Sequence, residues 1–254
     1  MKHIPNIFTL LNLFFGCLAI VAVLQTGLDT AQDTNGETLF IIPERIYLAS
    51  VFIGIAAVID FLDGFVARLF RATSSLGKQL DSLADVVSFG VAPGMIMYQF
   101  LRLSYAQQEN GLDLNIIWLL PAFLLPCAGA YRLGRFNIDD SQAFGFKGLP
   151  IPAAAIFIAS FPLLYWYSNQ YWIVSTLLNR WFLYGVILLV AYLMVSTLPM
   201  LALKFRNLSV RSGMPFILIG VLTVVTAFVF HWLAVPVCII LYILVSLIYR
   251  PSAL

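Results

Sequence analysis

Long apolar runs separated by short polar segments most constrain what this chain can fold into. A helix of roughly 20 apolar residues crosses the hydrocarbon of a bilayer with its backbone hydrogen bonds satisfied internally. Runs near this length lie at about 7–25, 46–70, 79–101, 115–136, 150–168, 181–203, 213–230 and 232–249. With 61% hydrophobic and 10% charged residues, the composition is far from that of soluble proteins. We predict an all-α, polytopic integral membrane protein with about eight transmembrane helices.

The lysines and arginines predict how these helices are oriented. Cytoplasmic loops of membrane proteins are enriched in both residues. With the N-terminus inside, the cytoplasmic segments carry Lys2, Arg68, Arg71, Lys78, Arg132, Arg135, Lys147, Lys204, Arg206, Arg211 and Arg250, against Arg45, Arg102 and Arg180 outside. Both termini are therefore expected in the cytoplasm. The net charge of +2, without a basic run interleaved with aromatic residues, gives no indication of nucleic-acid binding.

One stretch breaks the apolar pattern with four aspartates. Asp60 and Asp63 are three residues apart, and Asp81 and Asp85 are four apart, so each pair lies on one face of a helix. Carboxylates in membrane helices are costly and are functional by default. Four like charges would repel one another unless one or two divalent cations joined them. Mg²⁺ suits such oxygen ligands and commonly binds substrate phosphates as well. The alternative is that the aspartates serve helix packing or ion pairs.

Small and basic residues accompany the aspartates. Gly64 and Ala67 follow the first pair by one turn, and Gly77 precedes Asp81 by one turn. These positions leave space beside the carboxylates for a bulky ligand. Arg68 lies one turn after Gly64, where a guanidinium can bridge phosphate oxygens or neutralise an aspartate.

The spacing of these residues resembles a family signature. The pattern Asp60-x2-Asp63-Gly64-x2-Ala67-Arg68-x8-Gly77-x3-Asp81-x3-Asp85 is similar, at all eight fixed positions, to that of the CDP-alcohol phosphotransferases. The resemblance implies their fold, a CDP-linked lipid donor, CDP-diacylglycerol, and release of CMP. It also implies that Gly64, Ala67 and Gly77 pack against the cytidine.

We assign roles to the aspartates on this basis. Asp60, Asp63 and Asp81 are the expected ligands of Mg²⁺ or Mn²⁺, with two ions expected. Asp85 is the expected general base for the attacking hydroxyl and a further metal ligand. Arg68 and Lys78 are expected beside the donor.

The start of the first helix carries Asn6 and Thr9 at helical spacing. These side chains can cap that helix. The alternative is contact with the donor, since similar P-N-x-x-T segments in the family line the nucleotide pocket. We include both residues in the predicted binding site for CDP-diacylglycerol.

A second polar stretch contains Arg132, Arg135, Asn137 and Lys147. Arginines at the inner ends of helices often anchor to lipid phosphates. The alternative, which we favour, is a second anionic site facing the aspartates. The segments R-L-G-R-F-N and F-K-G-L-P-I-P-A-A-A resemble those of membrane-embedded phosphatidylserine synthases, with Gly134 in an alanine position. This likeness implies L-serine as the acceptor; glycerol 3-phosphate, inositol phosphate and choline stay open.

The remaining expectations concern organisation. The chain reads as a single membrane domain, 1–254, in which about 1–203 form the catalytic helices and 213–249 a C-terminal hairpin around His231. Residues 26–45 are expected to be a solvated connector, with a metal site as the alternative. We expect a homodimer, surrounded by membrane lipids, in the plasma (inner) membrane of a prokaryote with a cytoplasmic active site. The competing class is a cation transporter, because intramembrane carboxylates also mark ion paths.

Overall fold

The computed structural model describes residues 4–32, 38–69, 74–108, 115–138, 146–168, 170–201 and 210–248. These residues are mostly helical. The helices are α1 (Ile4–Gln25), α2 (Tyr47–Leu69), α3 (Ser75–Asp85), α4 (Ala92–Ala106), α5 (Leu124–Ile138), α6 (Ile151–Tyr167), α7 (Tyr171–Leu177), α8 (Arg180–Val195), α9 (Val210–Phe230) and α10 (Ala234–Ile248). Strands are β1 (Asp29–Gln32), β2 (Thr38–Ile41), β3 (Phe146–Lys147) and β4 (Pro199–Met200).

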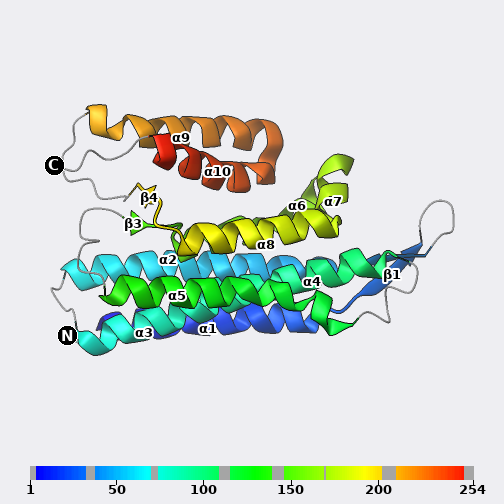
Figure 1. Cartoon of the computed structure of the whole chain (residues 1–254), viewed down its shortest axis with the longest axis horizontal. Helices are drawn as coiled ribbons and strands as arrows, with labels where there is room; N and C mark the ends of the chain where they lie inside the picture. Colours follow the sequence, from blue (N-terminus) through cyan, green and yellow to red (C-terminus); the bar gives the residue numbers. More distant parts are fainter. Residues whose placement is uncertain are drawn as a thin grey trace.

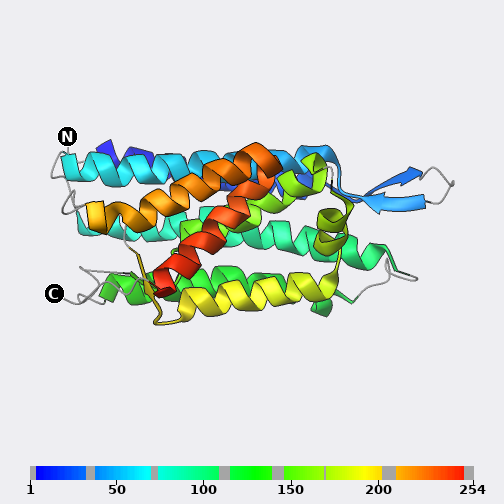
Figure 2. The same ribbon diagram turned by 90° about the horizontal axis from the view of Figure 1, so that it is seen from above.

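Helices α1, α2, α4, α5 and α8 lie roughly parallel or antiparallel to one another (Figure 1), whereas α10 crosses them obliquely (Figure 2). Helices α1 and α2 pack side by side, and α1 also contacts α3 and α4. A π-helical segment, η2 (Val86–Val91), joins α3 to α4 without a break. Helix α1 begins and α10 ends at one end of the molecule, while the β1–β2 hairpin projects from the other (Figures 1 and 2).

Fewer helices than predicted qualify as candidate membrane spans in the described part of the chain. Within the described residues, four helical runs are long and apolar enough to cross a bilayer, namely Asn6–Gln25, Glu44–Val66, Ser75–Ala106 and Gly220–Ile248. Helices α7 and α8 form a fifth if they count as one span bent by 70°. The prediction of about eight is therefore not confirmed, although the chain is mostly helical as expected.

Two predicted spans are shortened for local reasons. Around Pro121, the run 115–136 begins as the 3-10 turns η4 (Ile116–Trp118) and η5 (Leu120–Phe123) before α5 starts. The run 150–168 gives α6, which is only 17 residues long. Proline removes a backbone donor and fixes φ, so it favours a helix start over a helix interior.

The C-terminal run folds back on itself. Helices α9 and α10 pack against each other on either side of the 3-10 turn η7 (His231–Leu233). His231 has φ +49°, a left-handed conformation typical of tight turns. This agrees with the hairpin expected around His231. Helix α10 rests on α6.

The connector after α1 contains more structure than its composition indicated. Strands β1 and β2 pair antiparallel, with Thr30 opposite Phe40. The 3-10 turn η1 (Glu44–Ile46) then leads into α2, and Ile42 and Ile46 are fully buried. The expectation of a merely solvated loop missed this hairpin because both strands have only four residues and β1 is mostly polar. Residues 33–37 lie outside the described part of the chain.

Close packing fixes α1 against the centre of the bundle. A Cβ added to Gly16 would lie 2.2 Å from Ser88 Oγ and 2.8 Å from its Cα. Any larger side chain would therefore push α1 away from η2. This contact holds the first half of α1 beside the end of α3, where two of the aspartates lie.

A candidate active site built from two aspartate pairs

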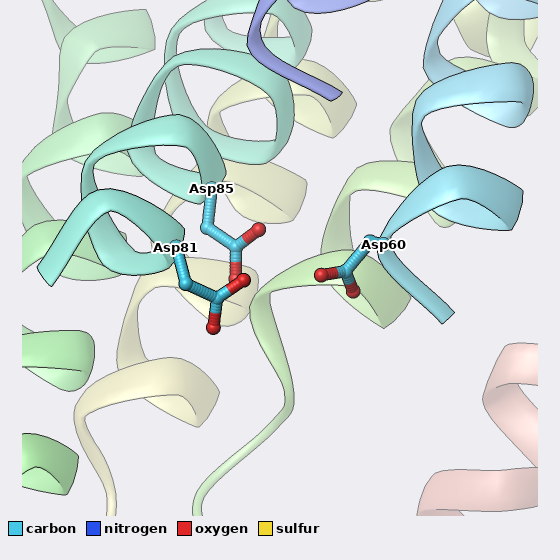
Figure 3. A group of neighbouring side chains, drawn as sticks. All are labelled: Asp60, Asp81 and Asp85. Atoms are coloured by element: carbon cyan, nitrogen blue, oxygen red, sulfur yellow. The ribbon is translucent and has the colours of Figure 1, made fainter. Parts of the chain in front are cut away.

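Three of the four predicted aspartates converge. Asp60 comes from α2, whereas Asp81 and Asp85 come from α3, and one carboxylate oxygen of each lies within 4.8 Å of the others. Their carboxylates point toward one another from the two helices (Figure 3). Asp60 and Asp81 are partly exposed, but Asp85 is buried. The three carboxylates therefore point at one centre, as their helical spacing predicted.

This arrangement fits a divalent cation. Hard cations such as Mg²⁺ take carboxylate oxygens as ligands. Three carboxylates this close, one of them buried, repel one another unless positive charge lies between them. Among the described residues, no other group of three acidic, histidine or cysteine side chains meets the same criterion. The alternative metal site in the 26–45 connector therefore has no support from its described residues.

Asp63 lies outside this group of three but belongs to the same environment. Its side chain is buried, and Thr9 Oγ1 donates a 2.5 Å hydrogen bond to Oδ2. The other oxygen, Oδ1, is buried and finds no hydrogen-bond partner in the described part of the chain. A buried carboxylate oxygen without a donor is rare and costly. Oδ1 is therefore available to a bound cation or a ligand donor.

Asp85 is held by a residue that the sequence analysis did not assign to the site. Asn12 Nδ2 donates to Asp85 Oδ1 at 3.1 Å, and Ser88 Oγ donates to the Asn12 carbonyl at 2.9 Å. Asn12 and Ser88 are fully buried. The available signal was the spacing of Thr9 and Asn12, three residues apart on one helix face within an apolar run.

A π-helical segment begins directly after Asp85. Such segments are rare and occur frequently at functional sites, because the extra residue per turn changes which side chains share a face. Here η2 brings Ser88 toward α1 while α3 keeps Asp81 and Asp85 one turn apart. The sequence contains no marker for this change of helical period.

Asn6 and Thr9 lie inside α1, which begins at Ile4. Neither residue therefore occupies the N-cap position, and the alternative that they cap this helix is wrong. A Cβ on Gly77 would lie 3.1 Å from Asn6 Oδ1, so the small residue allows α1 to approach the start of α3. Ser74 caps α3 by accepting a 2.9 Å hydrogen bond from the Gly77 N–H.

The structure describes the surroundings of two further residues that were predicted to contact the donor. Gly64 is half-buried on α2, one residue after Asp63. Lys78 is exposed, and its Nζ donates to the Asn137 carbonyl at 3.0 Å. The predictions for Ala67 and Arg68 fall on side chains outside those that the structure describes.

The two arginines of α5 have different surroundings. Arg132 is only 5% exposed, and it is close enough to Asp85 for electrostatic attraction. Its Nε has no hydrogen-bond partner among the described residues. A side chain this buried does not extend to lipid headgroups, so anchoring to lipid does not explain Arg132.

Arg135 instead ties α5 to the end of α8. Its Nη1 donates to the Val195 carbonyl and its Nη2 to the Ser196 carbonyl, both at 2.8 Å. Nη2 also lies 3.5 Å from the Lys147 carbonyl. Asn137 Nδ2 similarly donates to Ser82 Oγ at 2.8 Å. These two predicted binding residues make contacts within the protein that position the neighbouring elements.

Lys147 lies on β3, in a loop whose shape requires glycine. Gly148 has φ +78°, a conformation favoured by glycine. A Cβ there would lie 2.6 Å from the Met194 carbonyl oxygen. The Gly148 N–H donates to the Leu198 carbonyl at 2.8 Å. This loop is thus bound closely to the end of α8.

The sequence was compared with known protein families. Residues 2–192 match the CDP-alcohol phosphatidyltransferase family. The chain belongs to this family. The family membership confirms the resemblance seen in the aspartate pattern, and α9 and α10 lie beyond the matched residues.

Several relatives within the family share much of the chain. It is 35% identical over 196 residues to a CDP-diacylglycerol–serine O-phosphatidyltransferase of Helicobacter pylori, covering 76% of this chain and 70% of that protein. It is 34% identical over 156 residues to the protein of that name in Bacillus subtilis, covering 61% and 73%. An archaetidylserine synthase of Methanothermobacter thermautotrophicus is 32% identical over 168 residues, covering 65% and 60%.

Removing the hydroxyl of Thr9 should weaken metal binding through Asp63. Thr9→Val keeps the size of the side chain but leaves Asp63 Oδ2 without its donor. Loss of a residue that orients a metal ligand typically costs about tenfold in affinity. Titration of purified protein with Mn²⁺ measures this effect. The matched control is Thr26→Val, because Thr26 directly follows α1 and is also buried, but its hydroxyl donates to the Ala22 carbonyl instead of to a carboxylate. Equal affinities in both variants would contradict a role for Thr9.

Proposed function

We propose that this chain transfers the phosphatidyl group of CDP-diacylglycerol to L-serine, giving phosphatidylserine and CMP. The observation that carries the proposal is the convergence of Asp60, Asp81 and Asp85 in a chain of the CDP-alcohol phosphatidyltransferase family. The relatives that are named for serine transfer support the choice of donor and acceptor.

In this proposal the four aspartates have two different roles, metal binding and proton transfer. Asp60, Asp63 and Asp81 are the residues that would hold Mg²⁺ or Mn²⁺. A bound divalent cation supplies charge neutralisation for the diphosphate and for the CMP that leaves. Asp85 takes the proton from the attacking serine hydroxyl, which must lie within hydrogen-bond reach. Asn12 orients the Asp85 carboxylate for this task through its amide.

Arg132 is the proposed partner of the serine carboxylate. Guanidinium groups recognise carboxylates through two parallel hydrogen bonds. The burial of Arg132 and its electrostatic interaction with Asp85 support this role. Arg135 and Asn137 contribute by shaping the surrounding loops, and Arg135 and Lys147 add positive charge to them.

We further propose that the site opens to the cytoplasm of a prokaryotic cell. The distribution of lysine and arginine in the sequence supports this orientation. Helix α2 starts near the β1–β2 hairpin and ends at the opposite end of the molecule, where α3 begins (Figure 1). The aspartates therefore lie toward the end that carries the larger share of basic residues. The homodimer stays a prediction.

A panel of acceptors tests the proposed activity. Purified protein in nanodiscs receives CDP-diacylglycerol, Mg²⁺ or Mn²⁺, and one of serine, glycerol 3-phosphate, inositol phosphate, choline or ethanolamine. We expect CMP release with serine and little with the others, because they lack the carboxylate that pairs with Arg132. A preference for another acceptor would overturn the assignment of serine. Transport of Mn²⁺ into liposomes without CMP release would favour a cation transporter.

Replacing Arg132 should affect the acceptor more than the donor. In Arg132→Ala, we expect the KM for serine to rise by about 30-fold or more, as for loss of a charge-assisted pair, with a smaller change in the KM for CDP-diacylglycerol. The control is Arg102→Ala, which removes an exposed arginine from α4. Equal increases in both KM values for Arg132→Ala would show that this arginine holds the lipid diphosphate instead.

A further inference from the structure

The two-stranded β3–β4 ribbon connects the acceptor side of the site to the C-terminal hairpin. Phe146 pairs with Met200 and Lys147 pairs with Pro199. Strands of two residues are too short to be stable by themselves, so neighbouring elements must hold them. Figure 1 shows the ribbon between the helices that carry the aspartates and the end of α10.

Helix α10 holds the ribbon through both backbone polar groups of one residue. The Tyr242 hydroxyl donates to the Leu201 carbonyl at 2.9 Å, and the Leu201 N–H donates to Ser246 Oγ at 3.2 Å. Ser246 is fully buried, as is Met200 next to Leu201. Leu201 directly follows β4, so the position of this strand depends on α10.

Helix α5 contacts the ribbon and the end of α8 through Arg135. Arg135 donates to the carbonyls of Val195 and Ser196 and approaches that of Lys147. Three residues before it on α5, Arg132 is within electrostatic range of Tyr242 as well as of Asp85. Hydrogen bonds and strand pairing therefore run from α10 through β4 and β3 to Arg135, one turn from Arg132 on α5.

We propose that Tyr242 and Ser246 are positioning residues for the acceptor. They fix the β3–β4 ribbon so that Lys147 and Arg132 form one side of the pocket that receives the acceptor's carboxylate. The inference rests on the proposed function, since that assigns Arg132 to the acceptor. It gives the C-terminal hairpin, which lies beyond the family-matched residues 2–192, a part in selecting the substrate.

If Tyr242 and Ser246 position the acceptor, their loss should affect the KM for the acceptor and not the KM for the donor. Loss of one hydrogen bond that orders a binding loop should raise the KM for the acceptor by about three- to tenfold. The donor contacts α2, α3 and the start of α1 in this account, so its KM should stay the same. Because neither side chain touches the reacting atoms, kcat should change less than the KM for the acceptor.

The test compares Tyr242→Phe and Ser246→Ala with wild type in nanodiscs. Steady-state kinetics give the KM for serine, the KM for CDP-diacylglycerol and kcat, and thermal unfolding gives stability. Tyr184→Phe is the matched control, because the Tyr184 hydroxyl donates to the Trp118 carbonyl at 2.6 Å, away from the ribbon. We expect a raised serine KM in the first two variants and none in the control.

Two results would overturn the inference. One is an unchanged serine KM in both variants, including the case in which only thermal stability falls. The other is a parallel rise in both KM values, which would show a general distortion of the site. Failure of the proposed function is visible separately, in the wild type, as a preference for another acceptor. The KM comparison is then made with that acceptor and still decides whether α10 positions it.

Discussion

Asp85→Asn should remove nearly all turnover while leaving donor and metal binding detectable. Asparagine has almost the same shape as aspartate and can still interact with Asn12, but its amide cannot accept the proton of the serine hydroxyl. General bases contribute about 10² to 10⁴-fold to rate, so kcat should fall within this range. CMP release measures turnover, and Mn²⁺ titration with and without CDP-diacylglycerol measures binding.

The burial of Asp85 makes this variant informative. Its carboxylate is buried and receives one amide hydrogen bond from Asn12, so it is oriented before any substrate arrives. Asp29→Asn is the control, because Asp29 lies on β1 outside the cluster; it should behave as wild type. A loss of Mn²⁺ affinity in Asp85→Asn as large as that in Asp60→Asn would show that Asp85 is primarily a metal ligand.

Asp60→Asn and Asp81→Asn should each weaken metal binding by more than about 100-fold. This loss is larger than that caused by removing a residue that only orients a metal ligand. These residues supply two of the three converging oxygens, and an amide is a poorer ligand for a hard cation than a carboxylate. Activity should fall in parallel at low metal and recover in part at high metal. Mn²⁺ titration of each variant gives the affinities directly.

Asp63→Asn provides the comparison within this series. Asp63 lies outside the group of three and is oriented by Thr9, so its loss should cost less affinity than the loss of Asp60. Wild-type affinity in Asp60→Asn and Asp81→Asn would contradict a metal site between α2 and α3. In that case the convergence of the carboxylates would have to serve helix packing.

The aspartate cluster was predictable because its geometry is local. Two pairs with helical spacing put each pair on one face, and only the packing of α2 near α3 was needed to join them. The contact of Asn12 with Asp85 was not predictable in the same way. It depends on the close approach of α1 to η2 at Gly16 and Ser88, which joins residues more than 70 positions apart.

Other differences also come from long-range packing. Arg132 and Arg135 look equivalent in the sequence, yet the structure buries one near Asp85 and binds the other to carbonyl groups at the end of α8. Hydropathy predicted where the apolar runs lie but not how prolines divide them, as at the start of α5. The β1–β2 hairpin was missed because strands of only four residues carry little periodic signal.

The most direct test of the account follows both products in one reaction. Purified protein in nanodiscs with CDP-diacylglycerol and serine is treated with a chelator, and Mg²⁺ or Mn²⁺ is then added back while CMP and phosphatidylserine are quantified together. The account predicts no product with the chelator and equal amounts of CMP and phosphatidylserine after metal is restored. Phosphatidylserine formation that persists in the chelator, or CMP release without phosphatidylserine, would contradict it.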